Sequence, residues 1–199
     1  MHPATMNDQP TLPPSPELMS SADTGLLVVD VQEKLLAAIP HARRIVWNVR
    51  RLIDGARILN MPVAATEQYP QGLGRTAPEL AERLGDISAK LTFSCGGCPD
   101  LLKDFLARGV RKVLLVGLEA HVCVEQTAFD LLADGWSVLV AADAVGSRME
   151  IDHKIALRRM DSAGAAITTT EAALFEWCRA AGTPEFKQIS RLARETPPE

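Results

Sequence analysis

The sequence predicts an α/β fold: a three-layer αβα sandwich of Rossmann type, on a mostly parallel sheet of about six strands. Two observations support this prediction. Short apolar segments alternate along the chain with longer segments whose apolar residues recur at helical spacing. The short segments are almost continuously apolar, which is typical of parallel strands covered by helices on both faces. Right-handed crossovers between the strands are therefore expected.

The first half of the chain contains two predicted strands and one long helix. The apolar run 26–30 is the first strand, and it ends in the carboxylate of Asp30. A helix is predicted over 42–59, because its apolar residues lie on one face. These residues are Ile45, Val49, Leu52, Ile53, Ala56 and Leu59. Pro62 then separates the helix from a second strand at 63–67, and the Gly- and Pro-rich stretch 68–76 is predicted to be a loop.

The second half continues the alternation of strands and helices. A short extended segment at 89–93 precedes a helix from Pro99 to Ala107. The remaining predicted elements are a strand at 112–118, a helix at 122–135, a strand at 137–143, a helix at 150–164, a strand at 166–170, and helices at 171–182 and 184–195. The pattern contains no internal repeat and no strong linker, so one domain is predicted over residues 25–195.

The two ends differ in composition from this domain. Residues 1–24 are rich in proline and serine, and they are predicted to form a flexible N-terminal arm. Residues 196–199 are predicted to be a flexible tail for the same reason. The N-terminal stretch lacks the basic start and apolar core of a signal peptide, so a cytoplasmic location is expected.

Composition argues against several classes of protein. The formal net charge is -4 and no basic stripe is present, so nucleic acid is not an expected partner. No stretch approaches the roughly 18 consecutive apolar residues of a membrane span, so no membrane association is expected. The four cysteines are too few and too irregularly spaced for a secreted disulfide framework.

Polar residues stand at or just beyond the ends of the predicted strands. They are Asp30, Glu67, the group around Cys123, and Asp143. In parallel α/β sheets, ligands bind outside the carboxyl ends of the strands. A site is therefore expected at this edge, although Asp143 is expected to tether loop backbone rather than to take part in chemistry.

Cys123 lies where a predicted strand is followed by a helix. In the first turn of a helix the free backbone N–H groups and the helix dipole favour negative charge, which lowers the pKa of a thiol. The same N–H groups can hold an oxyanion. Asp30 is well placed to be a base, and Lys90 is one candidate for a nearby positive charge. The alternative is that Cys123 is a small buried apolar residue, as most free cysteines are.

Four motifs resemble those of the isochorismatase-like cysteine hydrolases. They are "LLVVDVQEKL", "TEQYPQGLG", "AKLTFS" and "VGLEAHVCVEQTAFDLLADGWSVLVAADAVGSR", in matching order within 25–195. The resemblance implies a catalytic triad of Asp30, Lys90 (ahead of Phe93 and Ser94) and Cys123. It also implies a cysteine thioester intermediate, and the likeness is greatest to isochorismatase-domain-containing proteins of unassigned substrate.

The resemblance implies further features of the site. A cis peptide is expected at Leu118–Glu119, with the backbone N–H groups of Glu119 and Cys123 forming the oxyanion hole. Candidate substrate contacts are Gln32, Glu67, Tyr69, Phe93 and His121. For Glu67 the alternative is a carboxylate that faces a helix or an interface. For His121 the alternatives are packing within the loop and pairing with Cys123. A homo-oligomer, either a dimer or a tetramer, is also implied.

Other signals indicate less. Cys95 and Cys98 form a "CGGC" motif, but no second pair of ligands at suitable spacing supports a zinc site, and the motif is not placed like a thioredoxin site. The stretch "TEQYPQG" has no histidine where related nicotinamidases bind a metal, so no metal site is expected. No glycine-rich phosphate motif follows the first strand, so no cofactor is expected. The tryptophans fit core or interface packing.

The sequence therefore predicts a cytoplasmic, metal-independent cysteine hydrolase acting on a small amide, carbamoyl or ureido compound. Because true isochorismatases generally lack the cysteine, Cys123 argues against vinyl-ether hydrolysis. Three alternatives stay open. The chain could be a catalytically quiet family member that acts as an interaction or scaffold protein. It could be a nicotinamidase-like amidase without the usual metal site. It could also signal through thiol oxidation of Cys95 and Cys98.

Overall fold

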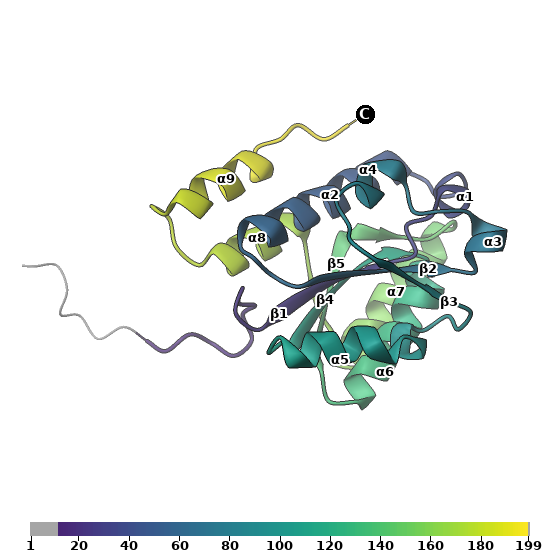
Figure 1. Ribbon diagram of the computed structural model, residues 1–199, viewed down its shortest axis with the longest axis horizontal. Coiled ribbons are helices and arrows are strands. Elements are labelled where there is room, and N and C mark those ends of the chain that lie inside the picture. The colour runs from purple at the N-terminus through teal and green to yellow at the C-terminus, as the bar shows by residue number, and fades with distance from the viewer. Residues whose placement is uncertain (1–11, 199) are drawn as a thin grey trace, which may run out of the picture.

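Six parallel strands form one sheet in the order β3-β2-β1-β4-β5-β6. The computed structural model describes residues 12–198. The strands are β1 (Thr24–Val29), β2 (Val63–Gln68), β3 (Ile87–Lys90), β4 (Lys112–Leu118), β5 (Ser137–Gly146) and β6 (Ala166–Thr168). The predicted sandwich with a parallel sheet is confirmed, because helices cover both faces of this sheet (Figure 1).

The long helices are divided between the two faces. One face carries α2 (Ala42–Ile58), α8 (Thr170–Cys178) and α9 (Pro184–Ala193), with the short α4 (Pro78–Ala81) beside α2 (Figure 1). The other carries α5 (Pro99–Ala107), α6 (Glu125–Ala133) and α7 (Glu150–Ser162). The short helices α1 (Glu33–Leu36) and α3 (Pro70–Leu73) and the turns η1 (Cys95–Gly97) and η2 (Ala120–Val124) lie in the connections.

The sheet separates two apolar cores. Alternate residues of β1 point to opposite faces, so Leu26 and Val28 join the core under α2, whereas Leu27 and Val29 join the core under α5 and α6. Both faces of the central strands are therefore buried, which explains their continuous apolar sequence. Trp177 lies in the first core and Trp136 in the second, as expected for core tryptophans.

Several element boundaries differ from the prediction. The predicted helix at 122–135 begins as the wider π-helical turn η2, in which the N–H of Val124 donates to the carbonyl of Glu119. The extended segment predicted at 89–93 ends as a strand at Lys90, because residues after it turn into η1. The loop predicted at 68–76 contains α3, which begins at Pro70, a residue whose fixed φ suits a first helical turn.

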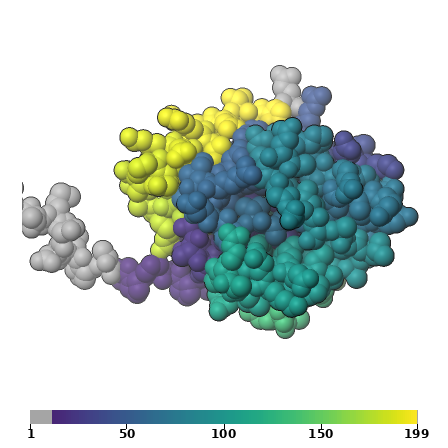
Figure 2. Space-filling view, viewed as in Figure 1, coloured from purple at the N-terminus to yellow at the C-terminus, as the bar shows by residue number. Residues whose placement is uncertain are grey.

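The chain packs against the domain before β1 begins. Residues 1–11 of the predicted arm lie outside the described residues, but Met19 is completely buried and its N–H donates to a Glu176 carboxylate oxygen at 2.9 Å. Figure 2 shows this purple segment against the yellow C-terminal helices. The ordered contacts of the chain therefore start earlier than residue 25.

Gly117 allows β4 to lie close to β1 beside the site. It has a φ of +121°, and a Cβ atom at this position would lie 2.0 Å from the carbonyl oxygen of Val29. The β4–β5 register also shifts between Leu115 and Gly117. Gly117 therefore meets a double requirement, a positive φ and a close backbone approach, that only glycine satisfies.

We expect Gly117→Ala to lower the free energy of unfolding by at least about 3 kcal/mol, because the new Cβ would force β4 away from β1. Gly135→Ala is the matched control. Its φ is +86° but nothing lies within 4 Å of the added Cβ, so only the backbone strain of about 1 kcal/mol is expected. Urea unfolding measures both. Equal losses in the two variants would contradict the close approach of β4 and β1.

Candidate active site

Asp30 and Cys123 come together because they follow neighbouring strands. Asp30 is the residue after β1, and Cys123 lies in η2, shortly after β4. Strands β1 and β4 are adjacent in the middle of the sheet, where the chain order reverses. Parallel α/β sheets bind ligands at such a switch point, outside the carboxyl ends of the strands. Lys90, the last residue of β3, reaches the same edge.

Asp30 and Lys90 form a buried ion pair. Lys90 Nζ lies 2.6 Å from Asp30 Oδ2, and the two side chains are 1% and 0% exposed. The hydroxyl of Thr66 donates to the other carboxylate oxygen, Oδ1, at 2.8 Å. Asp30 has a φ of +52°, an uncommon conformation that aspartate tolerates better than most residues. Both oxygens of the carboxylate are therefore held by donors.

The ammonium group of Lys90 is surrounded by further acceptors. It donates to the carbonyl oxygens of Phe93 at 2.8 Å and Thr92 at 3.3 Å, and to Gln68 Oε1 at 3.2 Å. A buried charge is tolerated when it is paired and hydrogen-bonded in this way. The position of the ammonium is therefore fixed by β2, β3 and the turn that follows β3.

Cys123 is almost completely buried beside this pair, with 5% of its surface exposed. Burial raises the pKa of the Cys123 thiol above its ordinary value, and Asp30 raises it further by its negative charge and by accepting a hydrogen bond from the thiol. The positive charge of Lys90 lowers this pKa and offsets the rise only in part. The expectation of a lowered thiol pKa is therefore wrong for the resting site.

The charges of the three groups explain this direction. With Asp30 ionised, Lys90 protonated and Cys123 a neutral thiol, the cluster has no net charge. Loss of a proton to solvent would leave a second buried anion next to a single cation. Transfer of the thiol proton to Asp30 keeps the net charge at zero. This arrangement can therefore form a thiolate by internal proton transfer.

The backbone ahead of Cys123 has one feature that the resemblance implies. The Leu118–Glu119 peptide is cis, as predicted from the resemblance. Within residues 12–198 the N–H of Glu119 donates to no protein acceptor, whereas the Glu119 carbonyl accepts from Val122 and Val124. The Glu119 N–H is therefore available to an incoming oxygen. That it and the Cys123 N–H bind an oxyanion stays a prediction.

His121 does not pair with Cys123 in the described part of the chain. Its Nδ1 lies 3.0 Å from Ser147 Oγ and 3.4 Å from Glu119 Oε2, and its Nε2 lies 3.8 Å from a carboxylate oxygen of Asp152. Arg148 holds the other oxygen of Glu119 at 2.6 Å. These contacts favour packing of His121 between η2 and the start of α7. A substrate contact of His121 stays a prediction.

Gln32 and Glu67 use their polar atoms on the chain itself. Gln32 Nε2 donates to the carbonyls of Gln68 and Gly74, and its Oε1 accepts from the N–H of Gln68. The Glu67 carboxylate accepts from the N–H and hydroxyl of Thr76 and from Arg75. Burial raises the pKa of Glu67, but these three donors outweigh it and hold the pKa below its ordinary value. Both residues thus brace the loop between β2 and α4.

The two aromatic candidates lie at the surface near Lys90. Tyr69 is 50% exposed and Phe93 is 51% exposed. Asp143 tethers backbone, as predicted, because its Oδ1 accepts from the N–H and hydroxyl of Thr170. Sequence reasoning missed Thr66 and Gln68. They flank Glu67 at the polar end of β2, and their position at the carboxyl end of a predicted parallel strand could have revealed them.

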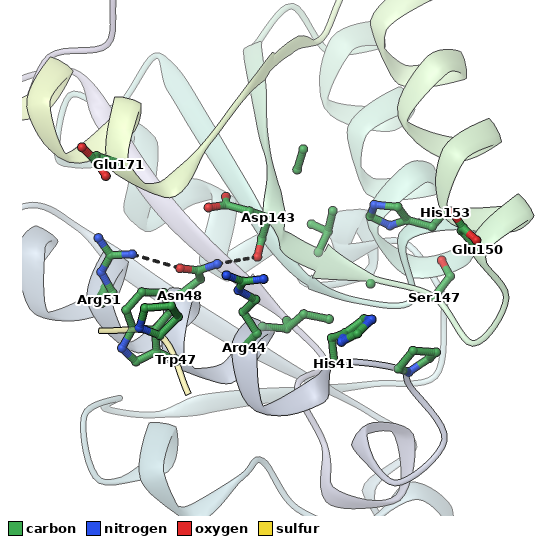
Figure 3. A pocket seen from close by; sticks show the side chains of 16 residues that line it. His41, Arg44, Trp47, Asn48, Arg51, Asp143, Ser147, Glu150, His153 and Glu171 are labelled. Atoms are coloured by element: carbon green, nitrogen blue, oxygen red, sulfur yellow. Dashed lines mark hydrogen bonds between the residues drawn. The ribbon is translucent and has the colours of Figure 1, made fainter. Parts of the chain in front are cut away.

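A separate cavity of about 660 Å³ lies at the carboxyl end of β5, between the starts of α2 and α7 (Figure 3). None of Asp30, Lys90 and Cys123 lines it. Part of its polar lining bonds within the protein: Asn48 donates to the carbonyl of Asp143 and accepts from Arg51, as Figure 3 shows. We therefore place the candidate active site at the triad rather than at this cavity.

The structure bears on two further features, a metal site and a membrane span. Between residues 12 and 198, no group of three or more His, Cys, Asp or Glu side chains could hold a metal ion. In the same range, no helix is long and apolar enough to cross a membrane.

The fold and the site define an α/β protein with a buried carboxylate, ammonium and thiol at the switch point of a parallel sheet. The family model "Isochorismatase domain" matches residues 24–172. The chain is 42% identical to isochorismatase domain-containing protein 2 of Pongo abelii over 176 residues, which cover 87% of this chain and 84% of that protein. The chain belongs to the isochorismatase family of hydrolases.

Solved structures agree with this assignment. The MAR1 ribonuclease of Caenorhabditis elegans is 42% identical with a TM-score of 0.85, covering 92% of this chain and 95% of that chain. YcaC of Pseudomonas aeruginosa, with hexane-2,5-diol and covalent acrylamide, is 26% identical with a TM-score of 0.83, covering 90% and 93%. YcaC of Escherichia coli, an octameric hydrolase of unknown specificity, is 26% identical with a TM-score of 0.83, covering 92% and 93%.

We expect Asp30→Asn to lower the pKa of Cys123 and Lys90→Met to raise it, because one change removes a like charge and the other an opposite charge. The rate of iodoacetamide labelling against pH, with the adduct on Cys123 quantified by mass spectrometry, measures both. Labelling of Cys178 in the same sample and circular dichroism control for access and folding. Unchanged profiles in both variants would contradict the coupling of the three groups.

The buried thiol of Cys95 should make stability depend on alkaline pH. Burial raises the pKa of Cys95 to about 11, so its contribution is complete below the unfolded value of about 8.5 and is lost as pH rises through the folded value. Between pH 9 and 10.5, we expect the free energy of unfolding to fall less steeply in Cys95→Ala, by up to about 1.4 kcal/mol per pH unit. Equal slopes in urea unfolding of wild type and variant would refute this.

Proposed function

We propose that this chain is a cysteine hydrolase that cleaves a small amide, carbamoyl or ureido compound through a thioester on Cys123. The observation that carries the proposal is the buried Asp30–Lys90 ion pair beside the Cys123 thiol at the switch point of the sheet. Membership of the isochorismatase family supports it.

In the first step Asp30 takes the thiol proton and the sulfur of Cys123 attacks the substrate carbonyl carbon. A sulfur–carbon bond forms, and the carbonyl electron pair moves to the oxygen. The resulting oxyanion is stabilised by the N–H groups of Glu119 and Cys123. The negative charge moves from the carboxylate to the sulfur and then to the substrate oxygen, and the ammonium of Lys90 balances this charge throughout.

In the second step the oxyanion collapses and the carbon–nitrogen bond breaks. The leaving nitrogen takes the proton from Asp30, which leaves a thioester and an ionised carboxylate. In the third step Asp30 takes a proton from water, and the oxygen of that water attacks the thioester. The carbon–sulfur bond then breaks, the thiol regains its proton, and the acid product leaves. Each step returns Asp30 to a state that the next step needs.

Two observations support a small substrate. Only 5% of Cys123 and 1% of the Lys90 side chain are exposed, so little room surrounds the reacting atoms. The P. aeruginosa YcaC structure holds covalent acrylamide, which is a small amide. Candidate substrate contacts are Tyr69 and Phe93, which are exposed beside Lys90, and His121 next to the oxyanion hole; Gln32 and Glu67 would act through the loop that they brace.

The remaining features of the proposal concern the whole protein. We infer that it works without a metal or a cofactor, in the cytoplasm, and as a homo-oligomer. The octameric state of E. coli YcaC supports oligomerisation. Size-exclusion chromatography with light scattering would test the oligomer.

A ribonuclease is the second candidate, because the C. elegans relative is described as MAR1 ribonuclease. The net charge of -4 and the burial of Cys123 favour a small neutral substrate over a polyanion. A catalytically quiet scaffold is the third. Hydrolysis of RNA that depends on Cys123 would favour the ribonuclease. Activity that is unchanged in every triad variant would favour the scaffold.

We expect a panel of small primary amides, carbamoyl and ureido compounds to include one whose hydrolysis releases ammonia. Cys123→Ser, Asp30→Asn and Lys90→Met should each lower kcat by about 10³-fold or more, since each removes a member of a unit that acts together. Asp30→Asn should do so although its thiol labels more readily. Ammonia release measures turnover, and hydroxylamine should capture the acyl group from the thioester as a hydroxamate.

The same experiment can contradict the proposal. Full turnover in Cys123→Ser, or hydrolysis with no acyl adduct on Cys123 under any quench, would rule out the thioester route. The variant Cys98→Ala is the matched control, because it removes another buried thiol that makes no hydrogen bond in the described structure.

A further inference from the structure

We propose that Cys95 and Thr127 are positioning residues that hold the nucleophile turn at a fixed place relative to Asp30. This inference rests on the proposed function and assigns a role to the "CGGC" motif that the triad leaves without one. The evidence is a chain of contacts through five buried residues, which are Asp30, Thr66, Cys95, Thr127 and Cys123.

The thiol of Cys95 contacts the base side of the site. Its sulfur lies 3.6 Å from the hydroxyl oxygen of Thr66, and that hydroxyl donates to Asp30 Oδ1 at 2.8 Å. Because the Thr66 hydrogen is directed at the carboxylate, the Thr66 oxygen can only accept from the Cys95 S–H. Cys95 and Thr66 are 0% and 1% exposed, so no water competes for this contact.

The backbone of Cys95 contacts the nucleophile side. Its N–H donates to Thr127 Oγ1 at 2.9 Å, and the same hydroxyl donates to the carbonyl oxygen of Cys123 at 2.6 Å. Thr127 is 0% exposed and lies four residues after Cys123, the spacing at which a threonine hydroxyl reaches back to a helical carbonyl. One hydroxyl therefore joins the turn at Cys95 to the turn at Cys123.

The turn that carries Cys95 is itself rigid. Ser94 Oγ accepts from the N–H of Gly96 at 3.0 Å and caps η1. Gly97 lies so close to Thr92 that an added Cβ would be 2.1 Å from its hydroxyl oxygen. Because Thr92 also supplies a carbonyl to Lys90, the same segment positions the ammonium and Cys95.

The protonation of Cys95 agrees with a role as a donor. Burial raises its pKa to about 11, with smaller opposing contributions from Lys90 and the hydroxyl of Thr127, so the thiol stays protonated near neutral pH. A protonated buried thiol donates a hydrogen bond and is a poor nucleophile. Cys95 therefore orients Thr66 and Asp30 rather than reacting itself.

The position of Cys123 matters because proton transfer and attack depend on sub-ångström placement. Displacing a reacting group by about 1 Å can cost about 100-fold in rate. The path from Asp30 through Thr66, Cys95 and Thr127 to Cys123 connects base and nucleophile through side-chain contacts, the N–H of Cys95 and the carbonyl of Cys123, in addition to their connection through the sheet. Loss of either link frees the nucleophile turn without changing any group that touches substrate.

The test compares Thr127→Val with Thr127→Ser and Cys95→Ala with Cys95→Ser. Valine keeps the shape of threonine and removes both hydrogen bonds, whereas Thr127→Ser keeps the hydroxyl. Cys95→Ser replaces the thiol with a hydroxyl that can still donate to Thr66. We expect Thr127→Val and Cys95→Ala to lower the rate constant for iodoacetamide labelling of Cys123 about 10-fold or more. The serine variants should stay within about threefold of wild type, and labelling of Cys178 should not change.

Cys98→Ala is the matched control within the motif. Cys98 belongs to the same "CGGC" stretch as Cys95, but its thiol has no hydrogen-bond partner in the part of the chain described. With a substrate in hand, kcat should fall in Thr127→Val and Cys95→Ala while KM stays unchanged. A purely structural role would lower the thermal midpoint and leave kcat of the folded enzyme intact. Should Thr127→Val not fold, the two Cys95 variants and Thr127→Ser still decide the question.

The outcomes separate this inference from the proposed function. If Asp30→Asn and Lys90→Met change Cys123 reactivity while Thr127→Val and Cys95→Ala match Cys98→Ala, the positioning role is overturned and the hydrolase proposal stands. If Asp30→Asn and Lys90→Met have no effect, the proposed function itself fails.

Discussion

The buried ion pair between Asp30 and Lys90 is the interaction on which the rest of the site depends. A carboxylate and an ammonium with almost no solvent exposure are stable only when each remaining lone pair and proton has a partner. Thr66, Gln68 and two backbone carbonyls supply these partners. The pair also acts on Cys123: burial raises the pKa of its thiol, Asp30 raises it further, and Lys90 offsets part of this rise.

The order of the strands explains how the pair and the thiol meet. Asp30 follows β1, Lys90 ends β3 and Cys123 follows β4, so three distant parts of the chain contribute one group each. The sheet order places β1 between β2 and β4. The order in which strands are added to the sheet reverses between β1 and β4, and this leaves their carboxyl ends open to a ligand. Gly117 lets β4 lie close enough to β1 for Cys123 to reach Asp30.

The sequence was informative where local physics decides structure. The apolar strands, the amphipathic helix α2 and the tether at Asp143 follow from spacing and residue type alone. It was misleading for Cys123, because the helix start favours a thiolate but burial and the charge of Asp30 act in the opposite direction. The sequence also did not reveal the partners of Gln32 and Glu67. These partners, Gln68 and Thr76, lie at the two ends of a loop whose path no local pattern specifies.

By itself, the sequence determined the fold class and indicated Asp30 and Cys123, because strand patterns, a terminal aspartate and a cysteine at a strand–helix junction are local features. Lys90 was expected only from the resemblance to the isochorismatase-like hydrolases, since no local pattern distinguishes it from the other lysines. Only the tertiary structure decided the protonation and the supports of these three residues. Burial, the contact between Thr66 and Cys95, and the shared hydroxyl of Thr127 each involve segments distant in the chain. The free energy of a buried charge depends on everything within a few ångströms of it, and those neighbours are defined only once the sheet has formed.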